Sequence, residues 1–373
     1  MKVRLTDICT PRQWKTIPTS ELLNEGYPVY GANGIIGYYN GYNHESPVVT
    51  ITCRGATCGT INITAPKSYV TGNAMCLDDL RPDVLLEYLY YSLLHYNFRN
   101  VISGSAQPQI TRQGLEKVNI ELHSLDEQRT IIDVLSKLER IILARKEELQ
   151  KLDNLVKARF VEMFGDMYLN TMEWRELQLE TMADIVSGIT KGRKIAGKQL
   201  TKVPYMAVSN VKDGYIDWTT VKTIEATDQE INQYRLLPDD VLMTEGGDPD
   251  KLGRGAIIRT PLENCIHQNH IFRVRLDESH ILPDYFAEYL KHQRAKRYFL
   301  GCAKQTTGIA SINMKQLKAL PVLLPPLELQ NEFSAFIRQI DKSKVVESIH
   351  RMNVLFNITL NGGNRYDIRA NEF

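Results

Sequence analysis

The residues from Ser124 to Gly165 predict one long amphipathic helix. Ser124 and Glu127 have the S-x-x-E spacing of a capping box, and Gly165 follows the last apolar residue, where a left-handed residue ends a helix at little cost. About 40 residues at a rise of roughly 1.5 Å each span about 60 Å, far more than the helix of an average globular domain. A narrow apolar stripe of this length requires a partner helix, unless the helix lies along one globular core.

An internal repeat places the partner helix in the same chain. The segment 115–125 (LEKVNIELHSL) has a counterpart at 317–327 (LKALPVLLPPL), an offset of 202 residues (317 − 115), and at this offset Gln128 aligns with Gln330. A repeat of this size is a duplicated domain with its helix, not a short solenoid repeat. The seam between the helices is predicted to contain Ile131, Leu135, Leu138, Ile142, Leu149, Leu152, Val156, Phe333, Ile337 and Ile340.

The repeat divides the chain into two globular regions, two helices and a tail. We expect a globular region at 1–123, a helix at 124–165, a second globular region at 166–326, a second helix at 327–360 and a polar tail at 361–373. Both globular regions contain short β-branched strands between glycine and asparagine turns, so the fold class is α+β. The second helix has the weaker stripe, with Lys344 and Asn353 near seam positions.

Composition limits the class of protein. The chain has 373 residues, of which 43% are apolar and 24% charged, and it contains no apolar run of 18 residues and no signal peptide. Six cysteines without a C-x-x-C pair indicate reduced thiols, so we expect a cytoplasmic protein. Cys53 and Cys58 with His44 suggest a metal, but no second ligand pair follows, so no metal site is expected. A net charge of +1 excludes a polybasic arm but not a local basic face.

The chain resembles the specificity (S) subunit of type I restriction–modification enzymes over essentially its whole length. The most specific features are the two domain closures at 110–128 and 312–330, each a polar turn, Ile-(Thr/Asn), an apolar strand, Leu-x-x-Gln and the helix. The segment 179–193, with its SGITKGR loop, also matches.

The resemblance implies two target-recognition domains held apart by helices that pair as an antiparallel coiled coil with pseudo-twofold symmetry. Each domain would then read one half of a bipartite target in double-stranded DNA. The implied partners are two methyltransferase (modification) subunits, with restriction (motor–nuclease) subunits in the larger complex. The resemblance gives this chain no catalytic role and no cofactor, since S-adenosylmethionine is expected on the partner methyltransferase subunit.

The residue patterns also disfavour an enzyme. The one Pro-Pro pair, within 324–327, lacks the preceding Asp or Asn and the following aromatic residue of an amino-methyltransferase, and no phosphate-binding Gly-x-x-x-x-Gly-Lys-Ser/Thr occurs. The acidic segment 246–250 has no paired carboxylate–lysine strand of a nuclease. His267 and His270 fit a turn or a DNA-facing edge better than a metal pair. We therefore expect no catalytic residue.

Basic and amide side chains in the predicted loops are the candidates for DNA contact, since lysine and arginine hold phosphates and amides read base edges. For each one, a solvated surface residue or a turn former is the alternative. The predicted phosphate contacts are Arg12, Lys15, Arg54, Lys191, Arg193, Lys194, Lys251 and Arg254, and the predicted base readers are Asn33, Gln107, Gln109, Ser209, Asn210 and Gln305. The remaining alternative is a scaffold that binds proteins instead of DNA, which the small net charge permits and the basic loop 191–198 disfavours.

Overall fold

The computed structural model of the chain divides into two compact units, Met1–Lys146 and Glu147–Phe373. The structure describes residues 1–94, 96–104, 107–194, 199–249, 252–306 and 309–361, with 305–306, 309 and 345–361 described by their backbone alone. Among these residues, no helix combines the length and the apolar character needed to cross a membrane.

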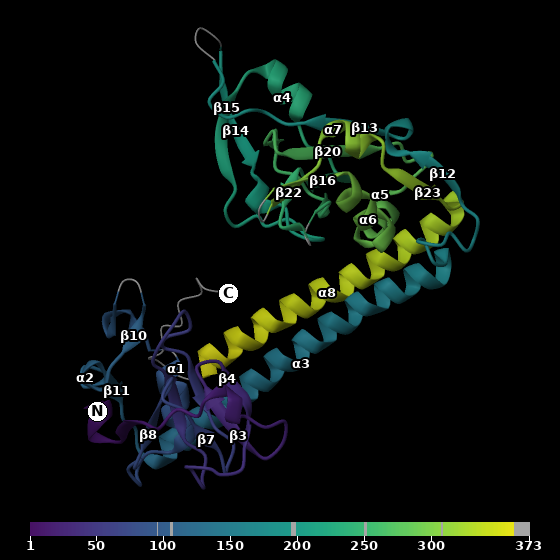
Figure 1. Cartoon of the computed structure of the whole chain (residues 1–373). Helices are drawn as coiled ribbons and strands as arrows, with labels where there is room; N and C mark the ends of the chain where they lie inside the picture. Colours follow the sequence, from purple (N-terminus) through teal and green to yellow (C-terminus); the bar gives the residue numbers. More distant parts are fainter. Residues whose placement is uncertain (95, 105–106, 195–198, 250–251, 307–308, 362–373) are drawn as a thin grey trace. The chain divides into compact units, whose positions relative to one another are not determined.

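The first unit is built on a four-stranded and a three-stranded sheet (Figure 1). The four-stranded sheet has the order β2 (Thr10–Gln13), β8 (Ala74–Asp78), β5 (Val49–Thr52), β6 (Ile61–Ile63). The three-stranded sheet has the order β4 (Gly34–Tyr39), β3 (Tyr27–Gly31), β7 (Tyr69–Val70). The remaining elements are the pair β1 (Lys2–Arg4) and β11 (Asn119–Glu121), the pair β9 (Ile102–Ser103) and β10 (Gln109–Ile110), and the helices η1 (Leu5–Asp7), η2 (Thr19–Glu21), α1 (Leu86–Leu94), η3 (Phe98–Asn100) and α2 (Arg112–Leu115).

The second unit repeats this plan. Its four-stranded sheet has the order β13 (Ala183–Ser187), β20 (Ile271–Leu276), β16 (Asp240–Thr244), β18 (Gly255–Ile258). Its three-stranded sheet has the order β15 (Lys222–Ala226), β14 (Thr201–Met206), β19 (Ile266–His267). The other elements are β12 (Arg175–Gln178) paired with β23 (Pro321–Leu324), the sheet of β17 (Gly246–Gly247), β22 (Ile309–Ser311) and β21 (Lys304–Thr306), and the helices η4 (Leu179–Thr181), η5 (Val208–Asn210), α4 (Asp228–Tyr234), α5 (Pro283–Lys291), α6 (Gln293–Cys302) and α7 (Met314–Lys318).

Backbone hydrogen bonds show that the two plans match residue by residue. In the first unit, the amide of Cys53 donates to the carbonyl of Asn73, and Cys53 accepts from Ile110. In the second unit, the amide of Glu245 donates to the carbonyl of His270, and the carbonyl of Glu245 accepts from the amide of Ile312. Ile110 and Ile312 are 202 residues apart, so the repeat found in the sequence is a repeat of the fold.

The first long helix, α3, runs from Leu125 to Phe164 as predicted. Its capping box is formed, because the amide of Ser124 donates to Glu127 at 2.9 Å and the amide of Glu127 donates to the Ser124 hydroxyl at 3.4 Å. Gly165 has φ +75°, the left-handed conformation expected just after a helix. The second long helix, α8, runs from Leu327 to Asn361.

A fully buried glutamine ties each long helix to its own globular domain. Gln128 accepts the amide proton of Leu85 at 2.8 Å and donates to the carbonyl oxygens of Asp83 and His123 at 2.8 and 2.9 Å. Gln330 repeats the pattern: its side chain accepts from Leu282 at 2.8 Å and donates to the carbonyls of His280 and Pro325 at 3.2 and 2.9 Å. We call these residues the glutamine ties.

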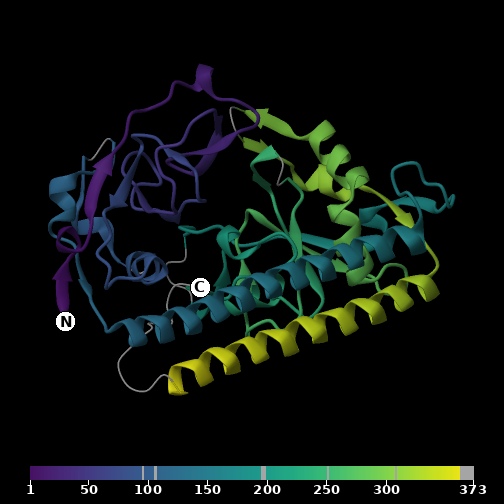
Figure 2. The same ribbon diagram turned by 90° about the horizontal axis from the view of Figure 1, so that it is seen from below.

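Within the second unit the two long helices pack side by side and antiparallel (Figures 1 and 2). Near the end of α3, the rings of Phe160 and Phe164 lie 5.4 and 5.5 Å from that of Phe333, which is near the start of α8. Earlier along α3, Asp153 accepts from Lys344, which lies further along α8, at 2.7 Å. The sequence thus runs in opposite directions along the two helices, and the α+β fold class with paired helices is confirmed.

The predicted seam residues have two kinds of environment. Leu152, Val156, Phe333, Ile337 and Ile340 belong to or pack against the core of the second unit. Ile131 instead packs against the core of the first globular domain, because the start of α3 lies on that domain. The others are partly buried, and their place in a seam stays a prediction: Leu135, Leu138, Ile142 and Leu149.

We predict that Gln330→Leu lowers the free energy of unfolding by about 2–4 kcal/mol, since it removes a fully buried side chain that bonds the Leu282 amide and the His280 and Pro325 carbonyls. The matched control is Gln150→Leu, on the exposed face of α3, which should change stability by less than about 0.5 kcal/mol. Urea unfolding followed by circular dichroism measures both. Equal effects would contradict a stabilising role for the tie.

Candidate nucleic-acid interface

Five loops of the first unit meet at one end of its four-stranded sheet. The Thr57 hydroxyl donates to the Asn33 side chain at 2.6 Å, and the Thr52 hydroxyl donates to the carbonyl of Ala32. Arg54 forms a β-bridge with Gln109. The Gln13 amide donates to the carbonyl of Gly72 at 2.9 Å and to the Cys53 sulfur at 3.0 Å. We call residues 13–16, 32–33, 54–57, 72–73 and 107–109 the first loop face.

Most of the candidates predicted in the first unit lie on this face and are exposed. They come from four loops that are far apart in the sequence, so only the fold brings them together. The loops present two cationic side chains and three amides, the residue types that contact phosphates and base edges. These exposed residues are Lys15, Asn33, Arg54, Gln107 and Gln109.

Arg12 lies beside the face, in a shallow hollow of about 410 Å³. Its guanidinium group pairs with Asp79 at 2.9 Å and remains half-exposed. Arg112 lines the same hollow, together with the half-buried ring of Trp14. Arginines around an aromatic ring suit stacking against a nucleotide, and neither Arg112 nor Trp14 was predicted as a site residue. The basic residues Arg12 and Lys15 on either side of Trp14 were the signal for the tryptophan, whereas Arg112 has no local signal.

The second unit has a corresponding set of loops, but with different side chains. Leu5 and Leu179 make equivalent amide bonds, to Val118 and Leu320, so the loop that carries Lys15 corresponds to the basic loop at 189–194. This loop leaves the sheet at Gly188, where an added Cβ would lie 1.9 Å from the His267 carbonyl oxygen, so glycine is required. We call residues 189–194, 208–209, 245 and 268–270 the second loop face. Its exposed candidates are Lys191, Lys194 and Ser209.

Two predicted residues of the second unit have structural roles instead. Asn210 is fully buried; it donates to the Asp217 carbonyl at 2.9 Å and accepts from the amide of Ala207 at 2.9 Å. Its side chain has no access to a base edge, so its prediction as a base reader is corrected. Arg193 donates to the Glu225 carbonyl and to Glu230, both at 2.8 Å. This hydrogen bond from Arg193 is the main cause that lowers the pKa of Glu230 to about 2, so the charge of Arg193 is already compensated.

The other candidates of the second unit are not placed on the loop face. Arg254 is half-buried. Lys251 lies outside the described residues, as does the side chain of Gln305, whose backbone belongs to β21. Their role in DNA binding stays a prediction.

The His267–His270 pair is divided by the fold. His270 is exposed and pairs with Glu245 on the second loop face. His267 is fully buried, and its ring nitrogens lie 3.0 Å from the Tyr234 carbonyl and 3.3 Å from the Val186 carbonyl. Burial lowers the pKa of His267 to about 4. His267 is thus neither a DNA-facing edge nor a metal ligand.

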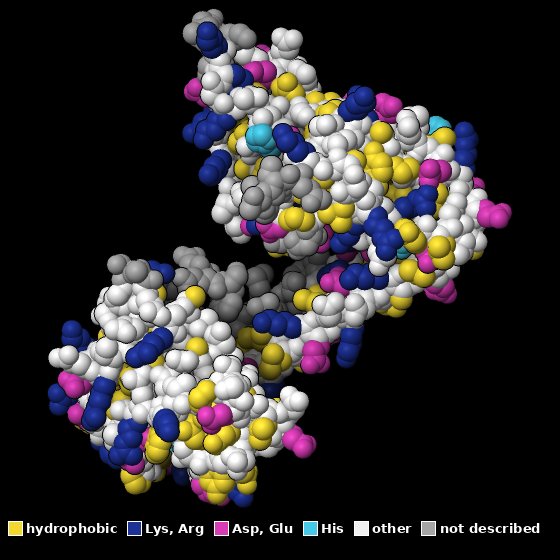
Figure 3. All heavy atoms as spheres, viewed as in Figure 1, with side chains coloured by type: hydrophobic (Ala, Val, Ile, Leu, Met, Phe, Trp, Pro, Cys, Tyr) yellow, Lys and Arg dark blue, Asp and Glu magenta, His cyan; other side chains and the backbone are white. Residues whose placement is uncertain are grey.

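Charge is mixed on the face of the molecule that Figure 3 shows. On the face shown in Figure 3, lysine and arginine side chains lie among acidic and apolar ones on each unit. This mixture agrees with the net charge of +1. DNA binding is therefore inferred from the individual side chains of the loop faces and not from the overall charge.

The comparison with protein families agrees with this geometry. The family model described as the type I restriction modification DNA specificity domain matches residues 1–154 and 172–353. The chain belongs to this family.

Individual relatives are distant in sequence. The chain is 23% identical over 283 residues to the type I restriction enzyme EcoKI specificity subunit of Escherichia coli (strain K12), covering 70% of this chain and 60% of that protein. It is 22% identical over 300 residues to the StySPI specificity subunit of Salmonella potsdam, covering 77% and 61%. The chain thus spans about 60% of the length of these relatives.

A solved structure shares the fold along nearly the whole chain. The S subunit of a type I restriction–modification system from M. genitalium matches with a TM-score of 0.60 at 15% identity, covering 96% of this chain and 94% of that one. At this identity the likeness concerns the fold.

We predict that burial of His267 makes the second unit sensitive to acid. Between about pH 6.5 and pH 4 the unfolded chain binds a proton at this histidine and the folded chain does not, so stability falls as the pH falls through this window. A lowering of about 2.5 pKa units corresponds to roughly 3 kcal/mol. Urea unfolding at pH 7 and pH 4.5 should show a smaller loss for His267→Gln than for the wild type. The control is His280→Gln, at an exposed histidine, and equal losses in all three proteins would contradict the prediction.

Proposed function

We propose that this chain is the non-catalytic DNA sequence-recognition subunit of a type I restriction–modification enzyme, in which each globular domain reads one half of a bipartite target. The observation that carries the proposal is the pair of loop faces. They stand at equivalent positions of a duplicated scaffold, but their side chains differ. A conserved scaffold with different loops is what two different half-sites require.

The side chains of the loop faces divide by chemistry. Lys15 and Arg54 on the first face, and Lys191 and Lys194 on the second, are exposed cations suited to phosphates. Asn33, Gln107, Gln109 and Ser209 carry donors and acceptors suited to base edges. The phosphate contacts set the position of the domain on the duplex, and the amides supply sequence discrimination.

The long helices set the gap between the two half-sites in this proposal. A helix of 40 residues, such as α3, is about 60 Å long, which is a spacing on the scale of one to two turns of B-DNA. The helices also dock two methyltransferase subunits, which carry S-adenosylmethionine, and restriction (motor–nuclease) subunits join the larger complex. A cytoplasmic location follows from this role.

The test is a pair of arginine variants in the full chain. Arg54→Gln on the first loop face should weaken binding to DNA duplexes of any sequence and reduce the slope of log affinity against log salt by about one, because one phosphate contact is lost. The control is Arg81→Gln, at an arginine that pairs with Asp83 beyond the opposite end of β8. Fluorescence anisotropy over a range of salt concentrations measures both slopes.

An unchanged slope for Arg54→Gln would remove the first loop face from the interface. Absence of DNA binding by the wild-type chain, with or without a methyltransferase subunit, would favour the protein-binding scaffold instead.

A further inference from the structure

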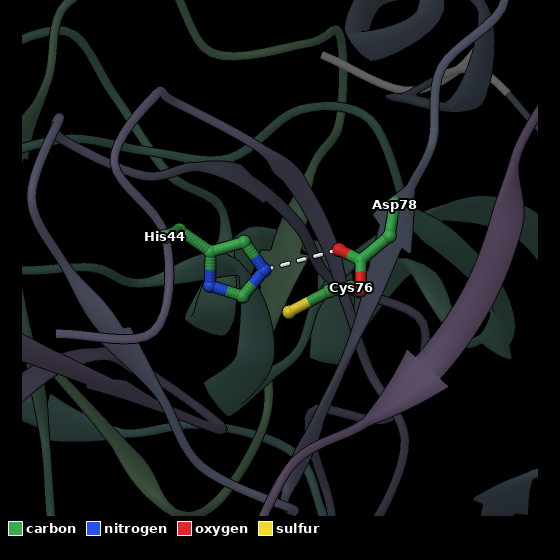
Figure 4. A group of neighbouring side chains, drawn as sticks. All are labelled: His44, Cys76 and Asp78. Carbon is green, nitrogen blue, oxygen red and sulfur yellow. Dashed lines mark hydrogen bonds and ion pairs between the residues drawn. The ribbon is translucent and has the colours of Figure 1, made fainter.

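Three potential metal ligands converge between the two sheets of the first unit. Cys76 and Asp78 are two residues apart on β8, so their side chains point to the same face of the strand. His44 reaches the same place from the loop that joins β4 to β5 (Figure 4). One ligand atom of each residue lies within 4.8 Å of the others.

Asn43 determines which nitrogen of His44 carries a proton. The Asn43 amide is oriented by two hydrogen bonds to Val70, since its oxygen accepts from the Val70 amide at 2.9 Å and its nitrogen donates to the Val70 carbonyl at 3.0 Å. The same oxygen lies 2.7 Å from Nδ1 of His44, which must therefore be the donor. In a neutral ring, Nε2 then carries a lone pair, which faces Oδ1 of Asp78 at 3.0 Å.

The other two groups also present electron pairs to this point. Oδ2 of Asp78 accepts from the Trp14 indole at 3.2 Å and lies 3.9 Å from Arg12, which leaves Oδ1 for the cluster. Cys76 is fully buried, and no hydrogen-bond partner of its sulfur is found in the described part of the chain. When the His44 ring is neutral, a nitrogen lone pair, a carboxylate oxygen and a buried sulfur therefore face one another.

The second unit carries different side chains at the equivalent positions. Thr50 pairs with Cys76 across β5 and β8, and the equivalent pair across β16 and β20 is Leu242 with Arg273. Cys76 therefore corresponds to Arg273, and Asp78 to Arg275.

Both arginines are held by acidic partners. Arg273 is buried and pairs with Asp184, while Arg275 makes two hydrogen bonds to the buried Asp240, at 2.7 and 2.8 Å. The second unit thus carries its own cations at these two positions, whereas the first unit carries a buried thiol and a carboxylate there, with a histidine beside them.

We propose that His44, Cys76 and Asp78 bind one divalent metal ion of zinc type, which ties the 40–48 loop to the four-stranded sheet. A neutral imidazole, a thiolate and a carboxylate together carry two negative charges, which a dication neutralises in a buried site. Nitrogen, sulfur and oxygen ligands suit zinc, and Asn43 orients the histidine from the other side as a second ligand layer does. Ligand atoms at about 2.0–2.3 Å from a tetrahedral zinc ion lie about 3.3–3.7 Å from one another. Zinc would therefore move Nε2 of His44 and Oδ1 of Asp78 slightly apart from their 3.0 Å, while the Cys76 sulfur already lies within 4.8 Å of both.

This site differs from the one that the sequence suggested and that we discounted. Cys53 and Cys58 are not part of it, and His44 pairs with residues 32 and 34 positions further along the chain. The competing arrangement is a proton on Nε2, which would give an imidazolium–carboxylate pair and leave the Cys76 thiol without a role.

The test is cobalt binding to the full chain, reduced and stripped of metal with a chelator. One equivalent of Co²⁺ should produce a sulfur-to-cobalt charge-transfer band, which Zn²⁺ then removes by displacing the cobalt. Cys76→Ala should abolish the band, whereas Cys265→Ala, at a buried cysteine of the second unit, should retain it. If Cys76→Ala fails to fold by circular dichroism, His44→Gln replaces it, with an expected loss of at least about tenfold in zinc affinity.

Two results would overturn the proposal. Absence of the band in the wild-type chain would leave the proton-sharing pair as the explanation, and a band that persists in Cys76→Ala would place the metal elsewhere. Thermal unfolding gives an independent readout, because zinc in excess should raise the unfolding midpoint of the wild type and of Cys265→Ala but not of Cys76→Ala.

Discussion

The glutamine ties are the interactions on which the arrangement of each unit depends. Each one joins the first turn of a long helix to the turn before a domain helix, α1 or α5, and to the carbonyl where the chain enters the long helix. A primary amide can bond both sites because its oxygen accepts from a backbone amide while its nitrogen donates to backbone carbonyls. Because both glutamine side chains are fully buried, these bonds are costly to break, so each helix begins in a fixed direction relative to its domain. A subunit that spaces two half-sites would need this property twice.

The duplication leaves the scaffold constant and lets polar side chains vary. Strand order and backbone hydrogen bonds agree between the units, while the loop faces and the layer between the sheets differ in charge. The second unit holds arginines that pair with carboxylates at the positions where the first unit holds Cys76 and Asp78. In the proposed function, the loops differ because the two domains recognise different half-sites. The buried layers differ in the groups that balance their charges.

Much of the scaffold could be predicted from sequence, because its signals are local or repeated. The capping box at Ser124 and the terminal Gly165 each lie within a few residues of the helix end that they specify. The alignment of Gln128 with Gln330 is not local, but the internal repeat makes it visible in the sequence. The repeat also predicted that the two units share one plan. The strand order could not be read directly, since it depends on pairing between distant segments.

The candidate site was only partly predictable, because exposure and pairing are tertiary properties. Asn210 follows Ser209 in a polar segment, yet one is buried and the other exposed. In the sequence, Arg193 is as good a candidate for phosphate contact as Lys191 and Lys194. The fold, however, pairs its charge with that of Glu230, which is 37 residues further along the chain. In sequence only Cys53 and Cys58 stood out beside His44, and no metal site was expected, whereas the fold brings Cys76 and Asp78 there from β8.

The most direct measurement of the central claim is selection of bound DNA from a randomised duplex pool by this chain co-expressed with a methyltransferase subunit. Two domains on helices of fixed length predict enrichment of a two-part motif with one constant gap between its halves. A single uninterrupted motif, or two halves separated by a variable gap, would contradict the account. Retention of DNA with no enriched motif, and with affinity that falls steeply with salt, would reduce the chain to a general phosphate-binding protein.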